Sequence, residues 1–248
     1  MKKPLVGIIS VLIILLLMCA FACNDSKSVA YLNSGIIKGD DLRDYSGAIK
    51  DFNRAIELSA KYAFAYFCRG TVKGWSGDHT GAIQDFNTAI ELKPKDATAY
   101  NGRGASKYFL KDYSAAIKDY NKAIELDPKT EYVYSNRCEA KNELKDYSEA
   151  IKDCNTAIIM DSQDAYAYFN RGLAQSKLGH NDESIKDYKK AIQYLNTIIA
   201  TFPRDAYAYY IKGLANIKLK NKDLALKDLN QAASLGCLPA REYIKAIK

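Results

Sequence analysis

The chain has 248 residues and a formal net charge of +7. That length leaves room for one repeat array of about 220 residues after an apolar N-terminal segment, and excludes a second large domain. Acidic and basic residues alternate along it, as in Lys118-Asp119 and Lys152-Asp153, so we expect a solvated charged face and no nucleic-acid surface.

The N-terminal segment has the layout of an export signal. Lys2 and Lys3 precede an apolar run over residues 4–22, and a polar stretch begins at Cys23. The sequence Ala20-Phe21-Ala22 places small residues one and three positions before the cysteine, and so resembles a relaxed bacterial lipobox. In that reading residues 1–22 are a lipoprotein-type signal peptide, Cys23 is lipid-modified, and residues 23–28 form a linker.

Two other fates of this segment fit the same residues. The Ala-x-Ala pattern also suits ordinary signal peptidase, which would release a secreted chain. Alternatively, about 19 apolar residues could span a bilayer without cleavage. All three fates place the rest of the chain outside the cytoplasm, because Lys2 and Lys3 hold the N-terminus inside.

From Ala48 onward, the register Ala-Ile-Lys/Gln-Asp-aromatic-Asn-x-Ala-Ile recurs every 34 residues. The copies begin at Ala48, Ala82, Ala116, Ala150 and Ser184, with a drifted copy at Ala225. The last gap is 41, which is 34 plus seven. A period of 34 predicts stacked helical hairpins, and we number each unit from position 1 to position 34.

Within the unit 97–130, the first helix is expected to run to about Leu110. Asp112 or Ser114 can then cap a second helix. In the next unit, Asp146 and Glu149 have the spacing of a capping box. Three prolines stand where each second helix should stop, because proline cannot continue a helix: Pro94, Pro128 and Pro203.

These residues resemble the tetratricopeptide repeat family, and with the N-terminal segment they are similar to its exported bacterial lipoproteins. The family pattern has an aromatic at position 4, a small residue at 8, Ala at 20 and 27, and an aromatic at 24. The chain supplies Tyr66, Tyr100, Tyr134, Tyr168 and Tyr209 at position 4, Gly70, Gly104, Gly172 and Gly213 at position 8, and Phe52, Phe86, Tyr120 and Tyr188 at position 24. The resemblance implies an all-α fold, a right-handed superhelical solenoid of six helix-turn-helix repeats with a C-terminal capping helix.

The expected units are 29–62, 63–96, 97–130, 131–164, 165–205 and 206–239, followed by a capping helix at 240–248. The first unit is degenerate, and the fifth contains the seven-residue insertion, which adds two turns to its second helix. We expect the added apolar residues either to cover the last unit or to dock a partner: Tyr194, Ile198, Ile199 and Phe202.

Two further patterns concern how the repeats are held together. Position 7 is basic from Arg69 to Lys212, and position 23 is Asp from Asp51 to Asp228, so we expect ion pairs between repeats. In the unit 131–164, cysteines replace the usual residues at positions 8 and 24. The family fold places these two, Cys138 and Cys154, opposite each other; whether they form a disulfide is left open.

Motifs for catalysis and metal binding are missing from the sequence. It contains no glycine-rich phosphate loop, no Gly-x-Ser-x-Gly and no Cys-x-x-Cys. The histidines, His79 and His180, fall where exposed turns are expected. We therefore expect no enzymatic activity, no cofactor and no metal.

The resemblance implies that partner proteins or peptides bind a concave groove lined by positions 2, 5, 9 and 12 of the first helices. Aromatic and aliphatic residues dominate these positions and basic ones are missing, which suits an apolar or extended segment. The predicted groove residues are Phe64, Phe67, Tyr108, Tyr132, Tyr166, Phe169, Tyr207, Tyr210 and Leu214. The Lys and Asn pair of the carboxylate clamp found in some family members is absent.

The sequence therefore predicts a non-catalytic interaction adaptor that is exported and membrane-anchored through a lipid at Cys23, and by analogy with lipid-anchored family members we expect it to serve envelope assembly. We expect a protein or peptide partner, and neither nucleic acid nor a small-molecule substrate. Two alternatives remain open: a self-assembling structural scaffold of the envelope, and a binder of cell-wall glycan, because aromatic grooves also stack sugars.

Overall fold

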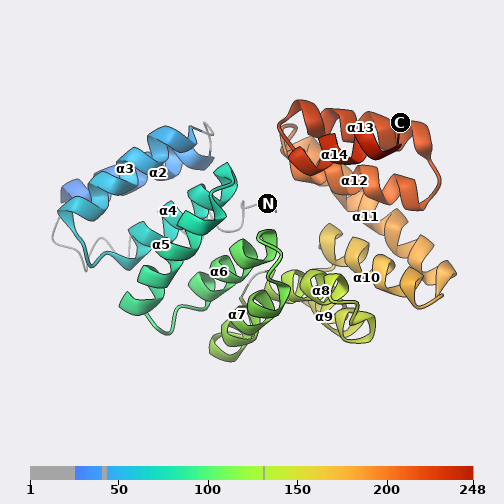
Figure 1. Cartoon of the computed structure of the whole chain (residues 1–248), viewed down its shortest axis with the longest axis horizontal. Helices are drawn as coiled ribbons and strands as arrows, with labels where there is room; N and C mark the ends of the chain where they lie inside the picture. Colours follow the sequence, from blue (N-terminus) through green and yellow to red (C-terminus); the bar gives the residue numbers. More distant parts are fainter. Residues whose placement is uncertain (1–25, 41–43, 131, 248) are drawn as a thin grey trace. The chain divides into compact units, whose positions relative to one another are not determined.

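A computed structural model describes residues 26–40, 44–130 and 132–247, and all regular structure in these ranges is helical (Figure 1). The predicted all-α repeat fold is therefore confirmed. The signal segment at residues 1–22 and the lipidation site at Cys23 lie outside the described residues. Among the described residues, no helix has both the length and the apolar character needed to cross a bilayer.

The helices follow one another as hairpins, with one further helix at the end. The hairpins are α2 (Ser26–Asp40) with α3 (Tyr45–Leu58), α4 (Ala63–Ser76) with α5 (His79–Leu92), α6 (Ala97–Phe109) with α7 (Tyr113–Leu126), α8 (Val133–Glu143) with α9 (Tyr147–Met160), α10 (Ala165–Lys177) with α11 (Asn181–Thr201), and α12 (Ala206–Lys218) with α13 (Lys222–Ser234), before α14 (Leu238–Ile247).

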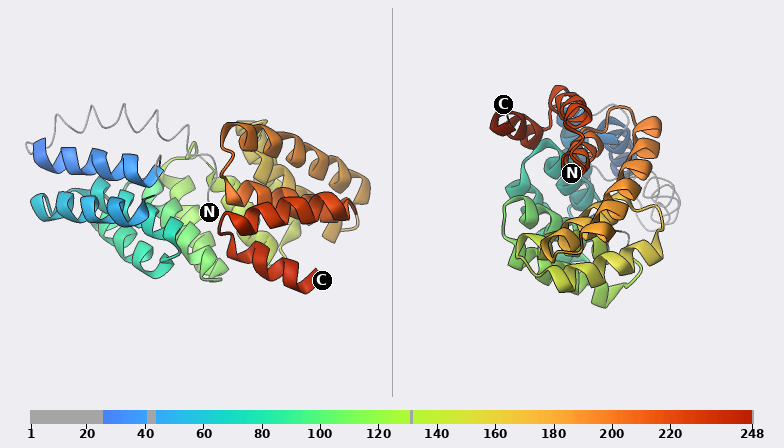
Figure 2. Two further views of the ribbon diagram at one scale, coloured as in Figure 1. Left: turned by 90° about the horizontal axis from the view of Figure 1, so that it is seen from above. Right: turned by 90° about the vertical axis from the view of Figure 1, so that its right-hand side faces the viewer.

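These helices form two compact units, which we call the N-terminal unit (α2–α7) and the C-terminal unit (α8–α14). Within each unit, the two helices of a hairpin pack together. The second helix of a hairpin then packs against the first helix of the next, as α3 does against α4 and α9 against α10. Figure 2 shows these neighbouring helices of each unit side by side.

Aspartates at the turns cap several helices. The Asp112 carboxylate accepts a hydrogen bond from the Ala115 amide at 3.1 Å, so Asp112 and not Ser114 caps α7. Asp146 precedes α9 but makes no side-chain capping bond, and Glu149 instead pairs with Lys152. The predicted capping box at this helix therefore does not form.

The turn inside several hairpins contains one residue in the left-handed region. Gly77 and Gly179 adopt φ values of 93° and 86° there, which glycine tolerates easily. Lys111, Lys145 and Lys220 adopt nearly the same geometry, with φ between 63° and 64°. The helix-to-helix path therefore imposes this conformation whichever residue occupies the turn.

In several hairpins a close contact joins position 8 of the first helix to position 24 of the second. A Cβ atom added at Gly104 would lie 2.7 Å from Cε1 of Tyr120, which is closer than packed atoms tolerate. The equivalent contacts at Gly172 and Gly213, to Tyr188 and to Leu229, would be 3.0 and 2.8 Å. The glycines are therefore needed because a large buried side chain lies directly over their backbone.

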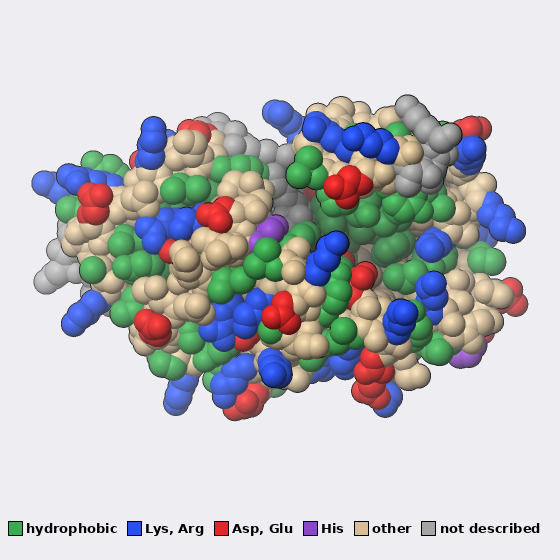
Figure 3. Space-filling model, viewed as in Figure 1, with side chains coloured by type: hydrophobic (Ala, Val, Ile, Leu, Met, Phe, Trp, Pro, Cys, Tyr) green, Lys and Arg blue, Asp and Glu red, His purple; other side chains and the backbone are tan. Residues whose placement is uncertain are grey.

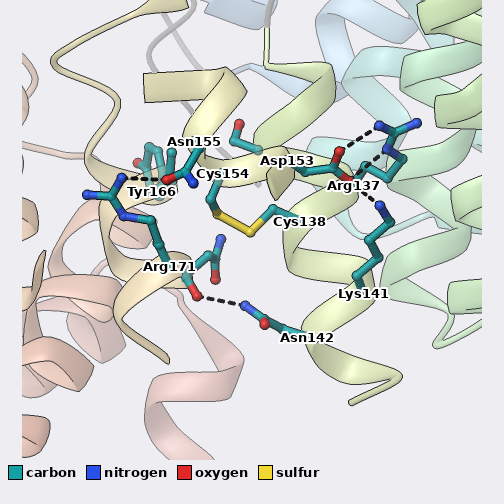
Figure 4. The surroundings of a disulfide bond; sticks show 12 residues. Arg137, Cys138, Lys141, Asn142, Asp153, Cys154, Asn155, Tyr166 and Arg171 are labelled. Carbon is teal, nitrogen blue, oxygen red and sulfur yellow. Dashed lines mark hydrogen bonds and ion pairs between the residues drawn. A yellow bond between two sulfur atoms is a disulfide. The ribbon is translucent and has the colours of Figure 1, made fainter. Parts of the chain in front are cut away.

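In the hairpin of α8 and α9, a disulfide replaces this contact. Cys138 and Cys154 are bonded, with their Cα atoms 5.5 Å apart, and neither side chain is exposed (Figure 4). The disulfide between Cys138 and Cys154, which the sequence left open, is therefore present. The two sulfur atoms take the place of the aromatic ring that fills this space in neighbouring hairpins.

Position 7 and position 23 form ion pairs within a hairpin. Nε and Nη2 of Arg103 donate to the two carboxylate oxygens of Asp119 at 2.9 and 2.6 Å, and Nζ of Lys107 adds a contact at 2.7 Å. Asp119 is only 4% exposed. The same pairing recurs in Arg69–Asp85, Arg137–Asp153, Arg171–Asp187 and Lys212–Asp228.

The expectation that these ion pairs join different repeats is wrong. Positions 7 and 23 lie on the facing sides of one hairpin, so the carboxylate meets the arginine of its own repeat. A hydrogen bond to a neutral amide links the repeats instead: Nη1 of Arg103 donates to Oδ1 of Asn87 in the preceding hairpin at 2.8 Å. Arg69 with Asn53, and Arg171 with Asn155, make the same contact.

The seven-residue insertion lengthens α11. Tyr194, Ile198 and Ile199 pack against a buried cluster that includes Leu195 and Ile211. These three residues therefore cover the last hairpin, which is the first of the two alternatives for the insertion.

We expect Asp119→Asn to lower the free energy of unfolding by about 3 kcal/mol, because the substitution leaves two cations facing a site without a charge. Urea denaturation at neutral pH measures this. The matched control is Glu125→Gln in the same hairpin, whose pair with Lys122 is 2.6 Å long but much more exposed. It should cost less than about 1 kcal/mol; equal losses would mean that the position 23 carboxylate has no special role.

The double substitution Cys138→Ser and Cys154→Ser should lower the free energy of unfolding by about 3 kcal/mol, because the bond closes a loop between cysteines 16 residues apart. The pair Cys138→Gly and Cys154→Tyr should recover part of that loss, since it installs the contact found in the neighbouring hairpins. Denaturation with and without a thiol reductant tests both variants. A Gly and Tyr variant no more stable than the serine variant would contradict the equivalence of the two contacts.

Candidate partner-binding surface

The predicted groove residues of the N-terminal unit are half-buried. Phe64 and Phe67 on α4 stack with their ring centroids 5.9 Å apart, and Phe67 also contacts Phe86 at 5.8 Å. Tyr108 on α6 lies 5.3 Å from Tyr113 of the second helix. Each of these rings packs partly against its own hairpin, and the rest of the ring is accessible.

Two predicted groove residues of the C-terminal unit do not lie on a surface at all. Tyr166 is 3% exposed and Phe169 is 5% exposed. The ring of Tyr207 stacks on Tyr166 at 5.5 Å, and Phe169 packs against Tyr188 at 5.8 Å. Both residues belong to the core of this unit, because a neighbouring aromatic ring covers each of them, and burial raises the pKa of Tyr166 well above its usual value.

A hydrogen bond from α12 to α8 lies across this surface. The hydroxyl of Tyr207 donates to Oε1 of Glu139 at 2.9 Å. These residues are 68 positions apart in sequence, and the α10 hairpin separates theirs along the chain. Tyr207 thereby covers Tyr166 and brings a carboxylate to the apolar residues of α12.

Glu139 is not among the predicted groove residues. It occupies position 9 of its unit, one of the four positions used to predict the groove. It is the one charged residue at those positions in the units from 63 onward. That lone charge is the signal in the sequence that singles out Glu139, whereas the groove prediction rested on aromatic and aliphatic side chains.

Tyr207, Tyr210 and Leu214 on α12 remain half-buried, as does Tyr132 at the start of α8. Burial raises the pKa of Tyr210 to about 12, and the nearby carboxylates of Glu139 and Glu143 contribute to this shift. We call Glu139, Glu143, Tyr207, Tyr210 and Leu214 the acidic-aromatic surface. It combines accessible aromatic area with negative charge.

The histidines differ from expectation in one respect. His180 precedes α11 and is exposed, but His79 is half-buried at the start of α5, where it stacks on Phe109 at 4.8 Å. Burial lowers the pKa of His79. Within the described ranges, no three His, Cys, Asp or Glu side chains are grouped so that they could hold a metal ion.

Comparison with known proteins agrees with the repeat pattern. Family profiles described as "Tetratricopeptide repeat" match residues 97–130, 165–195 and 206–235, and one described as "TPR repeat" matches residues 76–110. No curated protein matches the sequence.

Several solved structures share the fold at low identity. The MamA protein is 22% identical, with a TM-score of 0.58 over 71% of this chain and 95% of that one. PilW, described as a widely conserved type IV pilus biogenesis factor, is 15% identical, with a TM-score of 0.66 over 85% and 94%. YrrB, described as a TPR protein with an unusual peptide-binding site, is 21% identical, with a TM-score of 0.50 over 79% and 97%.

The 34-residue register, the hairpins and the family matches lead to one assignment. The chain is a tetratricopeptide repeat protein.

Proposed function

We propose that the chain is a non-catalytic adaptor that binds a protein or peptide partner on the first helices of its hairpins. The observation that supports this most is the set of half-exposed aromatic and aliphatic residues on α12 beside Glu139. Tyrosine and leucine on rigid helices offer large contact area at low entropic cost, as binding hot spots do. The peptide-binding site named for YrrB is consistent with such a role.

Seven of the nine predicted groove residues carry this proposal: Phe64, Phe67, Tyr108, Tyr132, Tyr207, Tyr210 and Leu214. Tyr166 and Phe169 support them from below and are not proposed to touch the partner. The C-terminal unit is the stronger candidate, because its exposed rings lie beside a carboxylate that can orient a ligand.

We also propose that the chain is exported and anchored through a lipid on Cys23. The layout of residues 1–22 supports this, and so does the buried disulfide between Cys138 and Cys154. Disulfides persist in oxidising compartments and are rare where thiols are kept reduced. A role in assembling envelope machinery is the narrower form of the proposal, which the likeness to PilW supports at the level of fold alone.

Photo-crosslinking in the native cell tests the adaptor role, with a photoreactive residue at Leu214. The control is the same residue at Lys152, which is 71% exposed on a second helix. We expect a discrete protein adduct from position 214 and none from position 152. Adducts of the chain with itself would favour the self-assembling scaffold, and adducts with cell-wall glycan would favour the glycan binder; either would contradict the adaptor role.

The anchor has its own test. We expect Cys23→Ser to move the chain from the membrane pellet to the soluble fraction after cell lysis, because a serine cannot accept the thioether-linked lipid. The double variant Cys138→Ser and Cys154→Ser is the control for loss of a cysteine, and it should stay in the pellet. Because an uncleaved apolar segment over residues 4–22 would also hold Cys23→Ser in the membrane, uptake of a radioactive fatty acid is measured alongside, and an unaltered chain that takes up no label would exclude lipid anchoring at this residue.

A further inference from the structure

The positive charge of the chain is unevenly distributed along the sequence. Residues 1–164 contain 22 Lys and Arg against 22 Asp and Glu, whereas residues 165–248 contain 14 against 7. The whole net charge of +7 therefore belongs to residues 165–248. Such an imbalance between parts of one chain points to an anionic partner for the basic part.

Burial increases this imbalance at the surface of the C-terminal unit. Asp187 and Asp228 are each 5% exposed and are paired with Arg171 and Lys212 inside their hairpins. Asp205 is 3% exposed and caps α12. Three of the seven acidic groups in residues 165–248 thus do not face the solvent.

Exposed cations gather on α13, on α14, which packs against α13, and at the turn that precedes α13. Two exposed acidic residues accompany them, and one of these, Asp223, lies in the first turn of α13, where the helix dipole offsets part of its charge. Among the described residues, none of these cations takes part in an ion pair. We call this set the basic surface: Lys218, Lys220, Lys222, Lys227, Arg241 and Lys245.

Large aliphatic side chains are exposed beside these cations. Leu224 on α13 is 54% exposed and precedes Lys227 by three residues, and Leu238 on α14 is 64% exposed and precedes Arg241 by three residues. Residues three apart lie on one face of a helix, so each helix presents a leucine and a cation together. Figure 3 shows Lys and Arg side chains along α13 on the face in view.

An anionic bilayer fits both features. Each lysine near such a surface strengthens binding by about fivefold, and aliphatic side chains beside the cations can enter the layer of lipid headgroups. Duplex nucleic acid would attract the same cations but makes no use of exposed leucines. An acidic protein would also be attracted, but one leucine on each helix does not supply the apolar core of a protein interface.

We propose that the basic surface binds an anionic phospholipid membrane, with Leu224 and Leu238 entering its headgroup layer. The proposal goes beyond the adaptor role, because it assigns a second partner to elements other than the first helices. It also does not depend on a lipid at Cys23, because it concerns attraction by the charged headgroups of the bilayer.

An environment-sensitive fluorescent amino acid at position 224 of the full chain tests this. The chain is added to vesicles of phosphatidylcholine alone or of phosphatidylcholine mixed with phosphatidylglycerol, so that insertion of the N-terminal segment is common to both. We expect blue-shifted emission only with phosphatidylglycerol, and its reversal by salt. The control position is Ile159 on α9, which is 84% exposed outside the basic surface and should show no shift.

Charge variants then identify the cations. Together, Lys222→Gln, Lys227→Gln and Lys245→Gln should weaken the attraction by about a hundredfold and abolish the shift at position 224. The matched control removes three exposed lysines of the N-terminal unit, by Lys50→Gln, Lys95→Gln and Lys118→Gln. It should keep the shift, with circular dichroism showing that both triple variants are folded.

Several outcomes would overturn the proposal. They are no shift with phosphatidylglycerol, an equal shift at positions 224 and 159, and an equal loss in the two triple variants. Duplex DNA and a polyglutamate peptide are also added to the neutral vesicles, and a shift from either as large as that from phosphatidylglycerol would replace the membrane with that class of partner. Crosslinking from position 214 is read separately, because a missing protein adduct there contradicts the adaptor role and not membrane binding.

Discussion

The close approach of the two helices within each hairpin is the constraint on which the structure depends. In three hairpins a ring at position 24 lies over a glycine at position 8, as Tyr120 does over Gly104. Burial of such a ring is strongly stabilising, but only while the space beneath it stays empty. The pair Cys138 and Cys154 satisfies the same constraint differently, because a covalent bond between two small side chains spans the gap that a ring would fill.

Polar contacts then divide into those within a hairpin and those between hairpins. The bidentate pair of Arg103 with Asp119 ties the first helix to the second, while its remaining nitrogen reaches Asn87 in the preceding hairpin. One planar guanidinium can serve both because its donors point in fixed, separate directions, which the ammonium of a lysine cannot imitate. Lys212 accordingly contacts the aspartate of its own hairpin, and Lys189 stands where the preceding hairpin would offer asparagine.

This framework leaves the first helices free to carry recognition, but the chain itself covers part of their surface. Tyr207 stacks on Tyr166 and donates a hydrogen bond to Glu139. Tyr166, which was expected to contact a partner, is therefore part of the core, and Glu139, which was not among the predicted groove residues, lies beside Tyr207. The first helices of the C-terminal unit therefore expose fewer aromatic rings than their positions in the repeat suggest.

From the sequence alone, the 34-residue period, the glycines and alanines of the buried stripe and the capping aspartates establish the helices, their order and the fold, because each depends on residues close together in one hairpin. Tertiary packing settled the matters that depend on contact across hairpins or on the path of the backbone. It buried Tyr166 beneath Tyr207, placed Glu139 beside the rings of α12 and held Lys111 in a left-handed turn. It also decided that the arginine at position 7 pairs with the aspartate of its own hairpin, because only the packed hairpin shows that positions 7 and 23 face each other.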